Sequence, residues 1–163
     1  MTCYHQRMNL QERFTNMVAS NQFLTLSTSH GDHPWISPVY FAADPSSGFK
    51  LFFISRRDTR HAENIRVQPN VAVSIYNSTC TPGQCDGVQL SATARELTST
   101  DDVTYGATVL FTRRFDDEAK RKPYLDPTRY QGGELMRIYE ITPQEIFVVD
   151  LGKPNDYRIE VDL

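Results

Sequence analysis

The sequence predicts a mainly β fold, an antiparallel β-barrel with accessory helices outside it, built as one domain over residues 1–163. The order of the strand-like segments predicts it. Most segments rich in β-branched and aromatic residues follow one another through short turns, without a helix between each pair. That order excludes a doubly wound sheet, in which strands and helices alternate. An antiparallel barrel is then the natural way for the strands to bury one face each.

The expected strands are separated by turn residues. The segment Ser29-His-Gly-Asp32 has turn chemistry, so the first two strands form a hairpin, and Asp44–Gly48 makes the next turn. We expect strands at Gln22–Ser29, Pro34–Ala43, Phe49–Ser55, Val71–Tyr76 and Gly87–Leu97, then a last pair, Glu134–Ile141 and Glu145–Leu151, around Thr142-Pro143-Gln144, and a short edge strand in the tail to Leu163.

Three helices are expected between or beside these strands. Apolar residues at i, i+4, i+7 and i+8 from Leu10 form one helical face. Hydroxyl and acidic residues at Thr98–Asp102 suit the start of another helix. The expected helices are Asn9–Ser20, with Asn9 as its N-cap, Thr59–Gln68, ended by Pro69, and one that opens at Thr98–Asp102, while residues 113–131 are expected to form an irregular loop or short helix.

Composition limits the partners that the chain can take. The net charge is −3 and the pI about 5.8, so no overall attraction to nucleic acid or to an anionic membrane is expected. No apolar run reaches the roughly 18 residues that a membrane span needs. The N-terminal segment lacks the pattern of a secretory signal. A cytoplasmic location is the resulting expectation.

The cysteines give a weak signal. Their number is three, and an odd number does not predict a complete disulfide framework. Cys80 and Cys85 flank a Thr-Pro-Gly-Gln segment that suits a closed loop or one half of a metal site. Because no second pair of ligands has suitable spacing, we expect a loop and no metal.

A cluster of cations marks the strongest candidate site. Three arginines and a histidine fall within six residues, Arg56 to His61, in a net acidic protein. They lie where an expected strand ends and a helix begins, with Thr59 as the natural N-cap. Free backbone N–H groups and the helix dipole favour an anion there, and Ser55, Thr59 and Arg60 add side-chain donors. The segment therefore predicts a phosphate site, and a solvated basic loop is the alternative.

Two strands carry residues that suit a flat ligand. Residues 35–41 are apolar but contain Ser37 and Pro38, and proline marks an edge or an irregular strand. An aromatic ligand can lie against such an edge, although a buried barrel strand explains the segment as well. In the strand that begins at Gly87, alternation places Gln89 opposite Val88 and Leu90. Its amide can reach a ligand ring or simply face solvent.

Taken in order, these segments resemble the pyridoxamine 5′-phosphate oxidase-like FMN-binding split-barrel family. The resemblance covers roughly Asn9–Leu97, with weaker support from Met136–Val149. It implies FMN at a homodimer interface. The family's flavin-contacting residues fall on Ile36, Ser37, Pro38, Val39, Tyr40 and Phe41 in one strand, on Ile54 and Ser55 at the end of the next, and on Thr59, Arg60 and His61 in the phosphate motif. The glutamine that the family uses near the ring falls close to Gln89, or at Gly87 in an alternative alignment.

The sequence departs from the family at several positions. His61 stands where the family has lysine, so a charged contact with phosphate would depend on its protonation. Ile36 and Phe41 replace a basic pair of the vitamin-processing oxidases, and the C-terminal arginine-leucine-proline ending is missing. We therefore expect a short relative and not a pyridoxamine phosphate oxidase.

The resemblance implies an FMN-dependent oxidoreductase whose small-molecule substrate or electron donor is open. The alternative is a non-enzymatic carrier or sensor of FMN or haem, because one fold hosts both roles. A deazaflavin is a third, weaker alternative. A homodimer is expected because 18 aromatic residues (9 Phe, 8 Tyr and 1 Trp) must be placed on a barrel with a broad apolar face.

Overall fold

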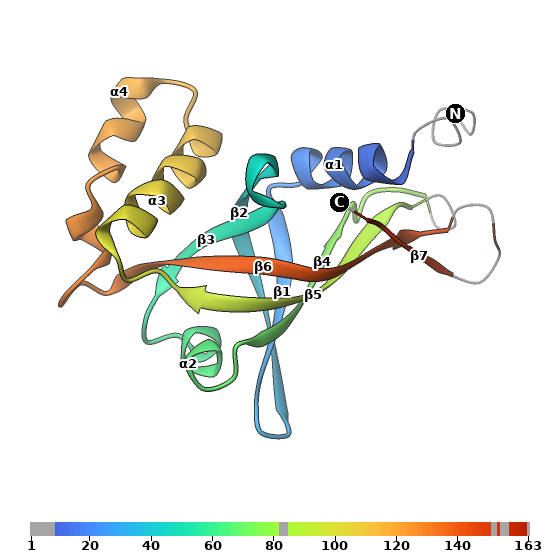
Figure 1. The fold of residues 1–163 in the computed structure, drawn as a ribbon, viewed down its shortest axis with the longest axis horizontal. Helices are drawn as coiled ribbons and strands as arrows, with labels where there is room; N and C mark the ends of the chain where they lie inside the picture. Colours follow the sequence, from blue (N-terminus) through green and yellow to red (C-terminus); the bar gives the residue numbers. More distant parts are fainter. Residues whose placement is uncertain (1–8, 82–84, 151–152, 154–156, 163) are drawn as a thin grey trace.

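The computed structural model describes residues 9–81, 85–150, 153 and 157–162. Antiparallel strands are hydrogen-bonded in the order β3-β2-β1-β4-β5-β6-β7, and β3 also pairs with β6, which closes six strands into a barrel (Figure 1). The expected mainly β barrel is thereby confirmed. The strands are β1 (Phe23–His30), β2 (His33–Asp44), β3 (Lys50–Arg56), β4 (Asn70–Tyr76), β5 (Gly87–Glu96), β6 (Met136–Val149) and β7 (Arg158–Glu160).

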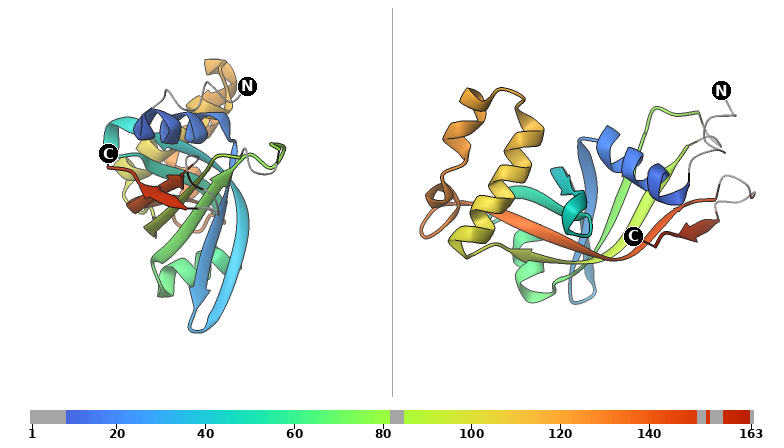
Figure 2. Two further views of the ribbon diagram at one scale, coloured as in Figure 1. Left: turned by 90° about the vertical axis from the view of Figure 1, so that its right-hand side faces the viewer. Right: turned by 45° about the horizontal axis from the view of Figure 1, so that its top comes forward.

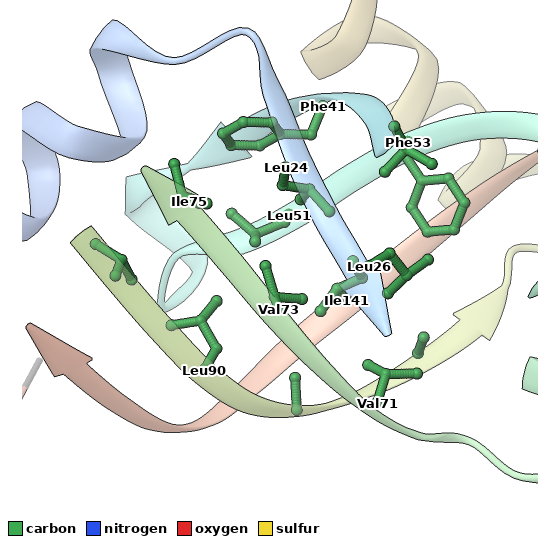
Figure 3. Close-up of a cluster of buried hydrophobic side chains, with 14 of the residues drawn as sticks. Leu24, Leu26, Phe41, Leu51, Phe53, Val71, Val73, Ile75, Leu90 and Ile141 are labelled. Carbon is green, nitrogen blue, oxygen red and sulfur yellow. The ribbon is translucent and has the colours of Figure 1, made fainter. Parts of the chain in front are cut away.

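Alternate side chains of β1, β4 and β5 fill the barrel. In β1, Leu24 and Leu26 are buried, while the residues between and beside them are not. Figure 3 shows side chains of several strands pointing toward one another inside the barrel. Aliphatic and aromatic residues from six strands therefore form one continuous core, which includes Leu24, Leu26, Phe41, Leu51, Phe53, Val71, Val73, Ile75, Leu90 and Ile141.

The helices lie outside the barrel, close to the expected places. The first, α1 (Leu10–Ser20), begins at Asn9 with a capping box to Glu12, as its sequence predicts. The helix α2 (Arg60–Val67) follows β3 directly, with Thr59 as N-cap. At the opposite end of the barrel from β7 (Figures 1 and 2), α3 (Thr100–Arg114) and α4 (Glu118–Arg121) are followed by the 3-10 turns η2 (Lys122–Tyr124) and η3 (Pro127–Tyr130).

The expectation of two separate strands at the end of the chain is wrong. The structure has one strand, β6, through the segment Thr142-Pro143-Gln144 that was expected to turn. Ser91 of β5 pairs with Glu145 and Ala92 with Pro143, so Gln144 is an extra residue in β6. A β-bulge accommodates such a residue, and proline is tolerated there because the ladder is already interrupted. The short tail strand is confirmed as β7, and the expected end at Leu151 lies outside the described residues.

The barrel opens between β2 and β3. These strands pair only from Phe41 to Asp44, opposite Lys50 to Phe53. Beyond that point β3 pairs with β6, whereas residues 33–40 of β2 pair with β1 alone. Among the described residues, one edge of β2 therefore has no strand partner around Pro38, as the proline predicted. The helix α2 and its preceding turn lie beside this opening.

The structure also bears on the expectations about the cysteines, a metal site and a membrane span. Cys80 and Cys85 form a disulfide, which closes the loop between β4 and β5. Within the described residues, no group of three or more His, Cys, Asp or Glu side chains is arranged to hold a metal ion. The helices found in those residues are all too short or too polar to cross a bilayer.

Candidate functional site

One histidine joins the two strands that separate. Nδ1 of His61 lies 3.1 Å from the hydroxyl of Ser37 on β2, and its Nε2 lies 2.8 Å from the hydroxyl of Ser55 on β3. Nε2 is also 3.1 Å from Oγ1 of Thr59. The ring is 8% exposed and packs edge-on against Phe53, at 6.0 Å between ring centroids. The imidazole thus bridges the opening of the barrel through three hydroxyl groups.

The hydrogen bonds define which nitrogen carries the proton. Thr59 donates its one hydroxyl hydrogen to the backbone carbonyl of Arg56, at 2.9 Å. Thr59 Oγ1 is therefore an acceptor toward Nε2, and Nε2 must carry the hydrogen. In a neutral ring Nδ1 is then the acceptor and receives the Ser37 hydroxyl. The single Nε2 hydrogen is shared between the oxygens of Thr59 and Ser55, so the hydroxyl hydrogen of Ser55 remains available to a ligand.

Burial decides the charge of this histidine. Removal from water lowers the pKa of His61 below its ordinary value, since desolvation penalises the charged ring. The neutral form agrees with the hydrogen bonds, which include an acceptor at Nδ1. A permanent positive charge at this position is therefore absent at neutral pH, unlike that of the lysine in the resembled family.

The N-terminus of α2 remains uncapped by side chains. Thr59 has the extended conformation of an N-cap, but its side chain makes no capping hydrogen bond to the helix. Its hydroxyl is engaged with Arg56 and His61 instead. The first N–H groups of a helix lack partners within it and attract anions. The turn thus combines outward N–H groups, the Ser55 hydroxyl and the side chain of Arg60, as expected from the sequence.

The arginines of this turn have different surroundings. The exposed guanidinium of Arg60 lies 4.5 Å from the ring centre of Trp35 on β2. Arg56 forms a two-pronged ion pair with Asp58, with N–O distances of 2.9 and 2.6 Å. Its charge is therefore compensated, whereas Arg60 makes no ion pair within the described residues. Arg60 is the cation best placed to meet a phosphate.

The residues of β2 face alternate sides. Ser37 and Val39 are buried, so Val39 offers a ligand only its backbone. Ile36 is 62% exposed, and Pro38 and Tyr40 lie on the same outward face. Ile54, at the end of β3, is partly buried. The structure therefore places the expected residues of β2, Ser55 and the α2 turn around one opening, whereas Ile54 packs on the side of α3.

Gln89 lies apart from this group within the chain. The expected alternation is confirmed, because Val88 and Leu90 are buried and Gln89 is exposed. Register connects Gln89 to Ser74, Ser74 to Thr25, and Thr25 to Pro38. Three strand spacings separate Gln89 from Pro38, about 14 Å along the sheet. The amide oxygen of Gln89 accepts from Nε of Arg158, at 3.0 Å.

Some features of the site are not visible in the sequence pattern. The contact of Arg60 with Trp35 joins two segments that are far apart in the sequence. The buried side chain of Asn64 on α2 donates a hydrogen bond to the hydroxyl of Thr28 on β1, at 3.0 Å. Asn64 lies three residues after His61 on the same buried face of α2, and it belongs to the helix that carries part of the family resemblance. The signal for the Arg56–Asp58 ion pair was the spacing of two opposite charges by two residues at the end of β3.

A barrel in which two neighbouring strands part, with polar groups at the opening, places this chain in the class of split-barrel proteins. The chain belongs to the pyridoxamine 5′-phosphate oxidase family, whose model matches residues 10–150. A curated relative, UPF0306 protein PM1958 of Pasteurella multocida, is 25% identical over 91 residues, which make up 56% of this chain and 60% of that protein. The match therefore spans less than two thirds of that relative.

Solved structures share the fold. A conserved hypothetical protein from Mycobacterium tuberculosis, Rv2991, superimposes with a TM-score of 0.71 at 17% identity, over 92% of this chain and 91% of that one. An FAD-binding protein from Mesorhizobium loti gives 0.63 at 15% identity, over 86% and 92%. HutZ, the haem storage protein of Vibrio cholerae, gives 0.64 at 18% identity, over 86% and 95%. Proteins that share this fold thus include one described as FAD-binding and one described as a haem storage protein.

Proposed function

We propose that this protein binds FMN at the opening between β2 and β3 and acts as a flavin-dependent oxidoreductase. The observation that carries the proposal is the bridge from Ser37 through His61 to Ser55, beside the uncapped start of α2. It leaves a hydroxyl donor, helix N–H groups and the guanidinium of Arg60, which makes no ion pair within the described residues, beside the same turn. Those are the donors that a phosphate monoester requires.

In this proposal His61 orients the site and does not carry charge. Its neutral ring holds Ser55 through Nε2, so that the serine hydrogen is directed to the phosphate. Arg60 supplies the positive charge, and Trp35 restricts its guanidinium by stacking. The stretch from Ile36 to Tyr40 offers the flavin ring an apolar surface and free backbone groups at an unpaired strand edge.

We propose further that the site is completed by a second copy of the chain. A ring that contacts Pro38 cannot also be expected to reach Gln89 of the same chain, because three strand spacings lie between them. A two-fold dimer allows Gln89 of one copy to approach the β2 edge of the other. Exposed aromatic side chains on this outer face, Phe23 and Tyr76, would be covered by the same contact.

When bound, FMN would supply the hydride or electron transfer itself. The chain's residues would bind the phosphate, hold the ring against β2 and restrict access of water. No acid or base is required of them for that transfer. A carrier of FMN uses the same contacts, so reduction of the bound flavin by a nicotinamide distinguishes an enzyme from a carrier.

The direct test is the absorption spectrum of the purified protein, followed by titration of flavin-free protein with FMN. A flavin spectrum and saturable binding near one FMN per chain support the proposal. A Soret band, with no FMN binding, would contradict it and favour the haem-binding alternative. Loss of FMN binding in Ser55→Ala and retention in Ser46→Ala, an exposed serine in the turn between β2 and β3, would locate the site.

A further inference from the structure

A cleft separate from the opening between β2 and β3 lies at the C-terminal end of α3, where the helical segment meets the end of the barrel. Its volume is about 520 Å³, within the usual range for small-molecule sites. The walls come from the end of β3, the last turn of α3, the η2–η3 segment and the start of β6. Ile54, one of the residues expected to meet the flavin, is part of the wall.

Two nearly parallel aromatic rings, those of Phe111 and Tyr124, lie in the wall of this cleft, and Phe115 packs next to them outside it. The rings of Phe111 and Tyr124 are 4.8 Å apart and inclined by 20°. Phe115 stacks on Tyr124 at 5.3 Å and 23°. The hydroxyl of Tyr130 donates to the carbonyl of Tyr124, at 2.9 Å, which fixes the η2–η3 segment. A planar ring is the ligand shape that such a wall favours.

Two arginines add charge to the cleft. The guanidinium of Arg129 lies 5.7 Å from the centre of the Tyr124 ring, and that of Arg114 lies 5.5 Å from Phe115 and 5.9 Å from Tyr40. Within the described residues, neither forms an ion pair with a carboxylate. Glu134 also lines the cleft. Two cations and one anion leave a net charge of about +1, which suits a monoanion.

We propose that this cleft binds a small planar aromatic carboxylate. Its ring would lie between the Tyr124 side and the apolar wall of Ile54 and Met136, and its carboxylate would pair with Arg129 and Arg114. Arginine is suited to this role because its planar fork matches a carboxylate. The binding site stands on these contacts alone, whereas its use as a substrate site rests on the proposed function.

The test uses 2-naphthoate as the probe and 2-naphthalenemethanol as its uncharged counterpart, with calorimetry on the full chain. Wild type should bind 2-naphthoate more tightly than the alcohol. Arg129→Gln should weaken 2-naphthoate by about 10- to 150-fold, the loss of one charge-assisted contact. Its affinity for the alcohol should stay unchanged. Lys120→Gln, which removes an exposed cation of α4 outside the cleft, should have no effect.

Arg129→Lys separates charge from folding, since it keeps the cation and should retain more affinity than Arg129→Gln. Absence of 2-naphthoate binding to wild type, or equal binding in wild type, Arg129→Gln and Arg114→Gln, would overturn the inference. FMN titration of the same samples separates the two proposals. Arginine-dependent binding of 2-naphthoate without FMN binding would refute only the flavin site, and the reverse result would refute only the carboxylate cleft.

Discussion

Ser37 and Ser55 hold opposite nitrogens of the same imidazole, across the point where β2 and β3 part. The two serines belong to strands that no longer pair with each other there. His61 therefore replaces the missing backbone hydrogen bonds with side-chain bonds. These hydrogen bonds hold the two strand ends in place while backbone and hydroxyl groups at the opening stay accessible to a ligand.

The neutral state of His61 predicts a dependence of stability on pH. Burial lowers its pKa in the folded protein, while in the unfolded chain it titrates near an ordinary pKa of about 6.5. As the pH falls below about 6.5, the unfolded chain binds the proton first. The free energy of unfolding of flavin-free protein should thus fall between pH 6.5 and the lower native pKa.

Urea denaturation from pH 5 to pH 8 measures this effect. His61→Gln should remove part of the dependence, because the amide has no proton to gain there. His30→Gln serves as control, since His30 is exposed at the tip of the β1–β2 hairpin. Equal pH profiles in wild type and His61→Gln would show that His61 is not held neutral by its surroundings.

Tyr139 carries a buried hydroxyl that lacks a hydrogen-bond partner within the described residues. Its ring stacks on Phe53 at 4.8 Å, and burial raises the pKa of the phenol. An unsatisfied buried polar group costs about 1–3 kcal/mol, so Tyr139→Phe should leave the free energy of unfolding unchanged or raise it by about 1 kcal/mol. Tyr130→Phe, which loses a bond to Tyr124, should instead lower it. A lower midpoint of urea unfolding in Tyr139→Phe would contradict this account.

Gly106 allows α3 to approach the barrel. A Cβ atom at this position would lie 2.9 Å from side-chain atoms of both Ile138 and Leu97. Gly106→Ala should therefore destabilise the protein by about 1–3 kcal/mol, although alanine favours helices. Gly133→Ala is the matched control, because a Cβ atom there would have no neighbour within 4 Å among the described residues. Thermal unfolding of both variants measures the difference, and equal melting temperatures would refute the close packing.

Flavin should strengthen the proposed dimer. If both chains contact FMN, binding favours the paired state by linkage. Light scattering at low micromolar protein should give a mass near twice 18.7 kDa, more completely with FMN than without it. A mass near 18.7 kDa in the flavin-saturated sample would refute the shared site.

Strand and helix positions could be predicted because their signals are local. The capping box at Asn9, the N-cap at Thr59 and the alternation around Gln89 all depend on neighbouring residues. The β6 strand could not be predicted, because its bulge at Gln144 is tolerated only through pairing with β5, far along the chain. A Thr-Pro-Gln segment has the same local chemistry in a turn and in a bulge.

The candidate site was predictable in its members but not in its connections. The cluster from Ser55 to His61 was visible as a motif. Its bridge to Ser37 depends on the divergence of β2 and β3, and the neutrality of His61 depends on burial, which no short segment encodes. The cleft around Arg129 was hidden because its wall comes from a segment whose sequence is polar and irregular.

The most direct test of the phosphate site compares FMN with riboflavin, which lacks the phosphate, in wild type and Arg60→Ala. Equilibrium dialysis gives both affinities for each protein, and Arg66→Ala, an exposed arginine in the last turn of α2, is the control. Wild type and Arg66→Ala should prefer FMN strongly. In Arg60→Ala that preference should shrink by about 10- to 150-fold, the value of one charge-assisted bond of about 1.5–3 kcal/mol, while riboflavin affinity stays unchanged. An equal preference for FMN in wild type and Arg60→Ala would contradict the assignment of the phosphate to this turn.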